Sequence, residues 1–338
     1  MSGETDQPEP AAQRLRELDA LRALCMLYIV GFHHVQAFWV GRMPPLLAAM
    51  LAHIVLGLFC LMSGYLLASR HRLEGSGAVG RFYIRRILRI YPLYFLALTA
   101  FLALKLIPPS SYLPGVFLLH VYLQKPLLTL WFVSLIVFLY AIAPLYLHRP
   151  SPRKTLLLTL ALYVPALLVR PYASGYLAAF ASGIFLAQVP RARDLFLRPG
   201  AALAALSALL MVGGGWFVVE RQIGEAGTWQ QLFGVAATLA AVPCVMSFSR
   251  LTIRVVPWRL VAVVSEASFA LYLVHRIFYK LVLQLYCPPA HTLVSELNLL
   301  CVLLPGAVLV AYAVQIGYDR ALEMLFPTAR RRPSPSTA

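Results

Sequence analysis

The residues best placed to do chemistry are Arg22 and His33, because both lie in the apolar stretch 18–40. Ionisable groups in hydrocarbon are costly and usually functional. The two positions are eleven residues apart, close to three turns of an α-helix, so they share one face at a rise of ~16 Å. Asp19 falls on the same face. The spacing predicts a stripe from a charged membrane surface to a buried imidazole, which can serve as general base, proton shuttle or acyl acceptor.

Each of these residues also has a structural interpretation. A lone buried histidine is usually a hydrogen-bonded core residue, and an arginine at a helix entrance usually anchors topology by reaching the headgroups. The combination of Asp19, Arg22 and His33 on one predicted face favours function, since intramembrane charge is functional by default.

A second candidate is the arginine cluster Arg85, Arg86 and Arg89 in the segment RRILRIYP. Spacings of three and four residues put Arg89 on the same helical side as the other two. Basic loops beside membrane spans are routine, so a purely structural role is a strong alternative. The functional interpretation is a phosphate clamp on the cytoplasmic side. The sequence leaves both open.

Further polar groups lie inside later apolar runs. Ser268, Tyr272 and His275 follow an i, i+4, i+7 pattern, which is one face of a helix. An earlier run holds Trp131 and Ser134. Such groups should face the interior of a helix bundle, where they either bond to neighbouring helices or take part in function.

Several common kinds of site are not indicated. His33 and His34 are adjacent and diverge on a helix, and the sequence has no HExxH motif or Cys/His array, so we expect no metal. There is no GxSxG elbow and no Gly-rich phosphate loop. The 5 cysteines lie in or beside apolar runs without a CxxC motif, and we expect small buried residues there.

The composition is that of a polytopic membrane protein. Of the 338 residues, 60% are hydrophobic and only 12% are charged, and the mean hydropathy is +0.75. A net charge of +16 would suggest a nucleic-acid partner in a soluble protein. Here the basic residues lie in short loops between apolar runs, which indicates membrane topology, so we expect the lipid bilayer as partner and no nucleic acid.

The apolar runs predict an all-α fold with about ten transmembrane helices. The runs are 18–40, 46–69, 87–107, 127–147, 155–169, 173–189, 201–219, 229–248, 260–286 and 293–317. Residues 1–15 are predicted to be a disordered cytoplasmic tail, 16–319 the membrane domain and 320–338 a basic cytoplasmic tail. No cleavable signal peptide is evident, so the first helix is expected to be an uncleaved anchor.

The stretch 112–123 is apolar but, at about twelve residues, too short for an ordinary span. If it does not cross, the basic loops fall on one side and both termini are cytoplasmic. If it crossed, the later basic loops would lie outside. The positive-inside rule therefore favours an outer-side or re-entrant segment, which is tolerated only where protein or water covers it.

Five segments, in this order, resemble the acyltransferase-3 membrane family, the O-antigen acetylase type. They are LDALRALCMLYIVGFH with Arg22 and His33, FCLMSGYLLASR with Ser63, FYIRRILRIYPLYF with the arginine cluster and Tyr91, LWFVSLIVFLY with Trp131 and Ser134, and ASFALYLVH with Tyr272 and His275. Two departures stand out. Many members carry a Glu shortly after the mid-chain Trp, and residues 134–137 hold no carboxylate here. Phe269 replaces the usual Tyr of the late motif.

The resemblance implies transfer of an acyl group, commonly acetyl, from cytoplasmic acyl-CoA to a hydroxyl of a cell-envelope glycan or lipid-linked sugar. It implies a multi-pass protein of the bacterial inner membrane. His33, Arg22 and Asp19 would be catalytic, with Arg85, Arg86, Arg89, Tyr91 and Ser63 binding acyl-CoA. Trp131, Ser134, Tyr272 and His275 would contact or orient the substrate. The CoA phosphates would rest on Arg22 and the arginine cluster. His33 would either take the acceptor proton or briefly carry the acyl group.

Two other function classes stay open. A secondary transporter or exporter of a glycan or lipid precursor is compatible with many helices and buried charges. Transporters often have paired repeats with helices broken at matching places, and Gly213–Gly215 and Pro243 have no matched partner here. A scaffold for envelope-assembly enzymes would need neither Arg22 nor His33.

Overall fold

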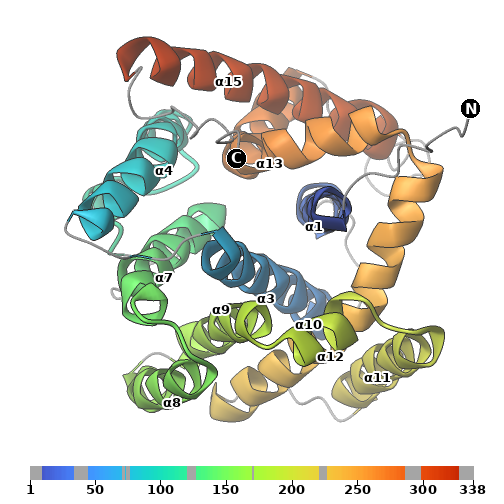
Figure 1. Ribbon diagram of the computed structural model, residues 1–338. Helices are drawn as coiled ribbons and strands as arrows, with labels where there is room; N and C mark the ends of the chain where they lie inside the picture. The colour runs from blue at the N-terminus through green and yellow to red at the C-terminus, as the bar shows by residue number, and fades with distance from the viewer. Residues whose placement is uncertain are drawn as a thin grey trace, which may run out of the picture. The chain divides into compact units, whose positions relative to one another are not determined.

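A computed structural model describes residues 10–33, 45–70, 73, 77–119, 127–169, 171–220, 227–285 and 298–326. All regular structure in these residues is helical, as predicted (Figure 1). The chain forms two compact units, each assembled from two separate parts of the sequence. The first unit comprises Met1–Arg70 and Ser151–Ser265, and the second comprises His71–Pro150 and Glu266–Ala338.

The first unit contains most of the predicted spans. Its elements are α1 (Pro10–Leu27), η1 (Tyr28–His33), α3 (Pro45–Arg70), α8 (Pro152–Val169), α9 (Pro171–Gln188), α10 (Pro190–Leu197), α11 (Ala201–Glu220), α12 (Gly227–Val255) and the start of α13 (Trp258–Leu285). Five of these helices begin at a proline. The fixed φ of proline and its missing N–H suit the first helical turn, so the sequence itself sets these starts. The start of α1 at Pro10 lies inside the tail that was predicted to be disordered.

Close helix packing in the first unit depends on glycines of α3 and α9. A Cβ atom at Gly64 would collide with the carbonyl oxygen of Phe180, and one at Gly183 would collide with that of Leu61. The two backbones therefore touch where α3 lies along α9 (Figure 1). The glycine of the SGY element thus has a packing function, because any side chain there would push the helices apart.

The contacts of α3 and α1 also fix helix directions. On α3, His53 faces Gly234 of α12, and Gly57 faces Thr238 one turn further along both helices. These two helices therefore run parallel. In contrast, Glu17 in the first half of α1 pairs with Arg250 near the end of α12, and residues further along α1 pack against earlier residues of α12. The apolar cluster between these two helices adds Leu18, Leu21 and Cys25 from α1 and Ala241, Val242 and Met246 from α12.

The second unit is organised around α4. Its elements are α4 (Ala78–Ala103), α5 (Pro109–Val116), η2 (Leu128–Leu130), α7 (Trp131–Leu147), the rest of α13, η3 (Leu299–Leu303) and α15 (Leu304–Leu325). Tyr83 of α4 donates a hydrogen bond to the Ala141 carbonyl of α7 at 2.6 Å. Further along α4, the Tyr94 hydroxyl neighbours Ser134. As the residue number rises along α4, the number of the contacting residue on α7 falls, so these two helices are antiparallel.

The ambiguous stretch 112–123 begins with the short helix α5, which folds back along α4. The Tyr91 and Tyr94 hydroxyls donate hydrogen bonds to the carbonyls of Val116 and Gly115, each at 2.9 Å. Tyr91 lies twelve residues before the end of α4, a rise of about 18 Å. An 8-residue helix cannot cross a bilayer. Tyrosines of α4 thus satisfy carbonyls at the end of α5, and a re-entrant path for 112–123 stays a prediction. Residues 120–126 lie outside the described part.

By length and composition, 6 of the described helices can cross a membrane, or up to 7 if α9 and α10 form one span bent by 114°. The predicted count of about ten is not confirmed. Every predicted run overlaps a helix in the described part of the chain, but α1, α8 and α11 are not among the helices that meet these requirements. Part of the first predicted run, residues 34–40, lies outside the described part. The structure also leaves the location of the termini as a prediction.

Candidate active site

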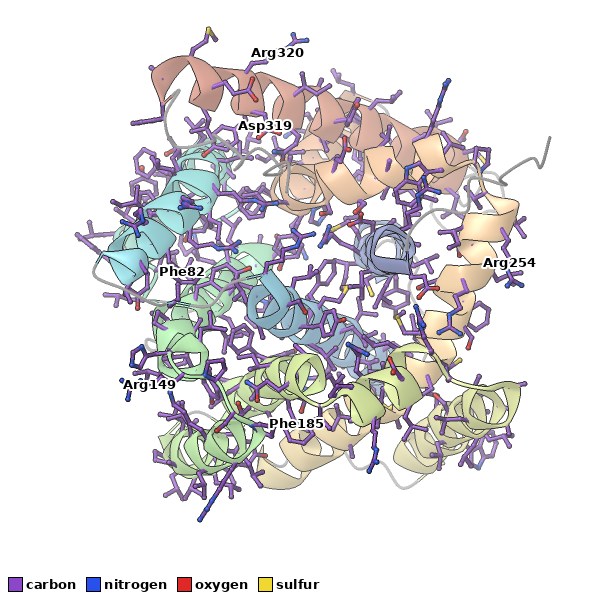
Figure 2. The ribbon with its side chains drawn as sticks, in the orientation of Figure 1. Phe82, Arg149, Phe185, Arg254, Asp319 and Arg320 are labelled. Carbon is purple, nitrogen blue, oxygen red and sulfur yellow. The ribbon has the colours of Figure 1, made fainter. Side chains whose placement is uncertain are left out.

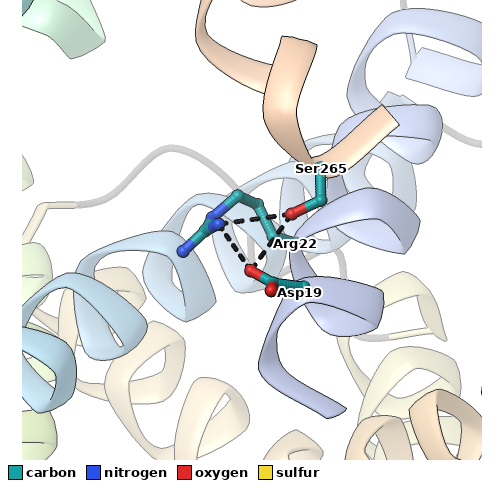
Figure 3. A network of polar contacts seen from close by, with 3 residues as sticks. All are labelled: Asp19, Arg22 and Ser265. Carbon is teal, nitrogen blue, oxygen red and sulfur yellow. Dashed lines mark hydrogen bonds and ion pairs between the residues drawn. The ribbon is translucent and has the colours of Figure 1, made fainter. Parts of the chain in front are cut away.

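The best-defined polar site in the first unit joins Asp19 and Arg22 of α1 to Ser265 of α13 (Figure 3). The Nη1 atom of Arg22 lies 2.9 Å from Oδ1 of Asp19 and 3.2 Å from Oγ of Ser265. The Ser265 hydroxyl lies 3.2 Å from the same Oδ1 atom and donates to it. Three polar groups from two helices thus form a closed ring of charge-assisted hydrogen bonds, which are stronger than neutral ones.

Local packing explains how α13 reaches this ring. Ala20 and Ala23 of α1 form an apolar cluster with Val261 of α13, and these small residues allow a close approach. One end of the contact is extended by Arg16, whose guanidinium lies 5.3 Å from the centre of the Trp258 ring. The side chains of Arg22 and Asp19 remain 25% and 35% exposed, so the ring is accessible rather than sealed in the core. Asp19 and Arg22, which were predicted to share a helix face, are therefore in contact, and Ser265 joins them.

His33 is the last residue of the π-helix η1, which follows α1 directly. The three-turn count from Arg22 assumed α-helical geometry throughout. A π-helix has i→i+5 bonding and a wider turn, so that count does not hold beyond Leu27. The His33 side chain lies outside the described part, and a shared face with Arg22 stays a prediction. Single π-turns occur frequently at functional sites.

The arginine cluster of α4 divides into two environments. Arg85 and Arg89, one turn apart, are exposed. The guanidinium of Arg86 instead lies 5.6 Å from the ring centre of Phe82 and 5.1 Å from that of Tyr140, and these contacts join α4 to α7. Figure 2 labels Phe82 on α4. The residues that were predicted to form one clamp are therefore two accessible cations and one cation engaged with aromatic rings.

Two other predicted donor-binding residues have structural contacts. The Tyr91 hydroxyl donates a hydrogen bond to the Val116 carbonyl at the end of α5, and the Tyr91 ring stacks on Phe95 with the ring centres 6.3 Å apart. Ser63 is half-buried on α3 beside Gly64, which sets the contact with α9. Tyr65, two residues after Ser63, lines a small surface pocket together with Glu17, Arg193 and Asp194. The SGY element therefore lies beside charged side chains of the first unit.

The late motif meets the mid-chain element inside the second unit. Tyr272 donates its hydroxyl to the Thr129 carbonyl, and its ring contacts Phe132 at a centroid distance of 5.8 Å. His275 is fully buried and its Nδ1 lies 3.0 Å from the Leu271 carbonyl. Ser134 is buried as well, whereas Trp131 is half-buried at the start of α7. The structure thus brings Tyr272 next to the element that holds Trp131 and Ser134.

The sequence prediction missed two participants, Ser265 and Thr129. Ser265 lies three residues before Ser268 in the segment SEASFALYLVH. The sequence would have indicated it only on the assumption that polar residues of this helix face α1. Thr129 contributes its backbone carbonyl, which leaves no signal in the sequence. In the described residues no group of three or more His, Cys, Asp or Glu side chains is arranged to hold a metal ion.

Comparison with known protein families decides the identity. The family profile Acyl_transf_3, described as an acyltransferase domain, matches residues 15–316. The chain belongs to the acyltransferase-3 family. No curated protein and no solved structure was found to match it. The matched range contains the Asp19–Arg22–Ser265 ring, η1 and the arginine cluster. Because the chain belongs to this family and has several helices long and apolar enough to cross a membrane, it is a membrane acyltransferase.

Proposed function

We propose that this acyltransferase-3 protein transfers an acyl group, in the simplest case acetyl, from cytoplasmic acyl-CoA to a hydroxyl of a cell-envelope glycan or lipid-linked sugar. The observation that carries the proposal is the fixed Arg22 guanidinium on the same continuous helical segment, Pro10 to His33, as the predicted catalytic imidazole. A preorganised cation at one end and a titratable base at the other suit an anionic donor and an alcohol acceptor.

The donor side of the proposal draws on arginines in each unit. In the second unit, the exposed Arg85 and Arg89 lie one turn apart on α4, a spacing that lets both bind one anionic group. In the first unit, Arg22 is half-exposed and held by two partners. CoA carries several phosphate charges, and arginine pairs with phosphate in a planar, bidentate geometry. Each of these two sets of arginines, taken by itself, therefore fits an anionic nucleotide thioester better than a neutral lipid.

In the proposed reaction the acceptor oxygen attacks the thioester carbonyl carbon. A C–O bond forms, the C–S bond breaks, and CoA leaves as the thiolate while His33 takes the hydroxyl proton. In the covalent variant His33 attacks first and then passes the acyl group to the acceptor. Both variants need a neutral imidazole at His33.

The proposal includes an inner-membrane protein with cytoplasmic basic loops and both termini inside, and the relative directions of the helices are compatible with that layout. In that layout α1 and α13 both start on the cytoplasmic side. Arg16 meets Trp258 at the start of both helices, and Arg22 meets Ser265 further along, so the two run parallel as required. The exposed Arg254 projects outward from the last turn of α12, in a predicted cytoplasmic loop (Figure 2). The antiparallel pair α4 and α7 agrees with 112–123 not crossing.

Mass spectrometry of envelope glycans and lipids tests the proposal. Cells that express the protein should contain an acceptor heavier by one acyl group, and cells without it should not. His33→Ala should lower acyl transfer by about 100-fold or more, because general-base catalysis contributes that much. His148→Ala, at an exposed histidine after α7, is the matched control and should leave transfer unchanged.

Two outcomes would contradict the proposal. The first is a His33→Ala protein that inserts normally and still acylates the acceptor at the wild-type rate. The second is uptake or efflux of a glycan or lipid precursor by reconstituted protein without acyl-CoA, which would indicate the transporter class.

A further inference from the structure

We infer that Ser265 is a positioning residue that fixes the Arg22 guanidinium for the phosphate groups of the acyl donor. This inference rests on the proposed function of Arg22. Nothing in the sequence motifs singles out Ser265, and its assignment comes from the contacts between α1 and α13. Its side chain does not need to touch the donor, because it acts through Arg22.

The hydroxyl of Ser265 is used in both directions. It accepts from Nη1 of Arg22 at 3.2 Å and donates to Oδ1 of Asp19, also at 3.2 Å. A serine hydroxyl has one donor proton and accepts through its lone pairs, so this geometry uses both capacities. Neither alanine, which has no polar group, nor cysteine, a weak donor and acceptor, replaces this arrangement.

Without Ser265, the pair of Asp19 and Arg22 would be a local contact within one helix. Such i, i+3 pairs on partly exposed side chains are weak and hold long side chains in one geometry only at an entropic cost. Ser265 is 4% exposed and lies on a second helix. It therefore ties the ion pair to a buried position on α13 and limits the rotamers of Arg22.

The neighbouring contacts keep Ser265 in place independently of the polar ring. Val261, one turn earlier on α13, packs with Ala20 and Ala23, and Trp258 contacts Arg16. Loss of the hydroxyl should consequently leave the two helices packed while the Arg22 side chain gains freedom. In the ring itself the contacts come from Nη1 of the guanidinium (Figure 3). The expected defect is thus in donor affinity and not in folding.

The test measures steady-state kinetics of purified protein in liposomes with acetyl-CoA. Ser265→Ala should raise the KM for acetyl-CoA about 5- to 10-fold with kcat within about twofold, the size expected for the net contribution of one hydrogen bond. Ser265→Cys should behave like Ser265→Ala. Ser265→Thr keeps the hydroxyl and should restore KM. Ser249→Ala is the matched control, because Ser249 is also buried and, among the residues that the structure describes, its hydroxyl donates to the Val245 carbonyl of its own helix.

A double-mutant cycle separates positioning from simple packing. If Ser265 acts through Arg22, adding Ser265→Ala to Arg22→Ala should change KM no further, whereas independent effects would multiply. The inference is overturned if the effects of the two substitutions on KM multiply. It is also overturned if Ser265→Ala and Ser265→Cys both have a KM within twofold of wild type. A KM for acetyl-CoA that is raised as much in Ser265→Thr as in Ser265→Ala would also contradict the inference.

The outcomes also distinguish this inference from the proposed function. Direct binding of CoA to the wild-type protein, by calorimetry, is measured first. A wild-type protein that binds no CoA and transfers no acyl group contradicts the proposed function and the inference with it. A wild-type protein that binds CoA and transfers acyl groups, with Ser265 variants unchanged, contradicts the inference alone.

Discussion

Helices α1 and α4 each bring arginines into a membrane protein, but the two regions hold them by different means. On α1, Arg22 is fixed by a carboxylate and a hydroxyl. On α4, Arg86 is held between two aromatic rings, while Arg85 and Arg89 stay exposed. A polar ring specifies the direction of a guanidinium, whereas a ring face mainly specifies its location. Adjacent arginines in one motif therefore need not share a function.

The largest difference is expected between Arg22 and Arg16, two arginines of the same helix. Arg22→Ala should lower kcat/KM for acetyl-CoA about 30- to 100-fold, because a charge-assisted contact to phosphate is lost and Asp19 is left without its cation. Arg16→Ala removes only the contact with Trp258 and should change kcat/KM less than about threefold. Initial rates in liposomes measure both, after insertion has been checked. Equal effects of the two substitutions would remove the distinction between the polar ring and the aromatic contact.

A second test compares residues within the α4 cluster. The double substitution Arg85→Ala and Arg89→Ala should raise the KM for acetyl-CoA about tenfold with unchanged kcat, since exposed cations contribute uniform binding. The effect should shrink at high salt, where exposed charges are screened. Arg86→Ala should instead lower the melting temperature in detergent and leave KM within about twofold, because it loses ring contacts between α4 and α7. An Arg86→Ala protein of normal stability with a large KM defect would restore the single three-arginine clamp.

How far the sequence predicted this site depends on the kind of contact involved. The Asp19–Arg22 pair follows from spacing on one helix, and the family follows from ordered motifs. Ser265 did not follow, because it comes from a helix more than 240 positions away and a lone serine has no pattern. The split among Arg85, Arg86 and Arg89 was equally hidden, since helical spacing does not show that Tyr140 of another helix lies over Arg86.

The fold shows the same limit. Hydropathy located the long helices that are described but not the short helix α10, and helix ends and span counts depend on packing and on prolines. The start of α1 at Pro10 and the π-turn at Tyr28–His33 both differ from a uniform helix over 18–40. In contrast, the expectation that 112–123 does not cross came from charge, and the antiparallel contacts of α4 and α7 agree with it.

The smallest expected effect concerns Tyr91, which the family resemblance predicted to bind the donor. Its hydroxyl donates to the Val116 carbonyl at the end of α5. Tyr91→Phe should therefore cost about 1 kcal/mol of stability, the value of one such hydrogen bond, and lower the melting temperature by a few degrees. The KM for acetyl-CoA should stay within about twofold, because the ring and its stacking on Phe95 are kept. Thermal melting in detergent and kinetics in liposomes are measured on the same preparation. Unchanged melting with a raised KM would move Tyr91 from the structural residues of α4 to those that bind the donor, beside Arg85 and Arg89.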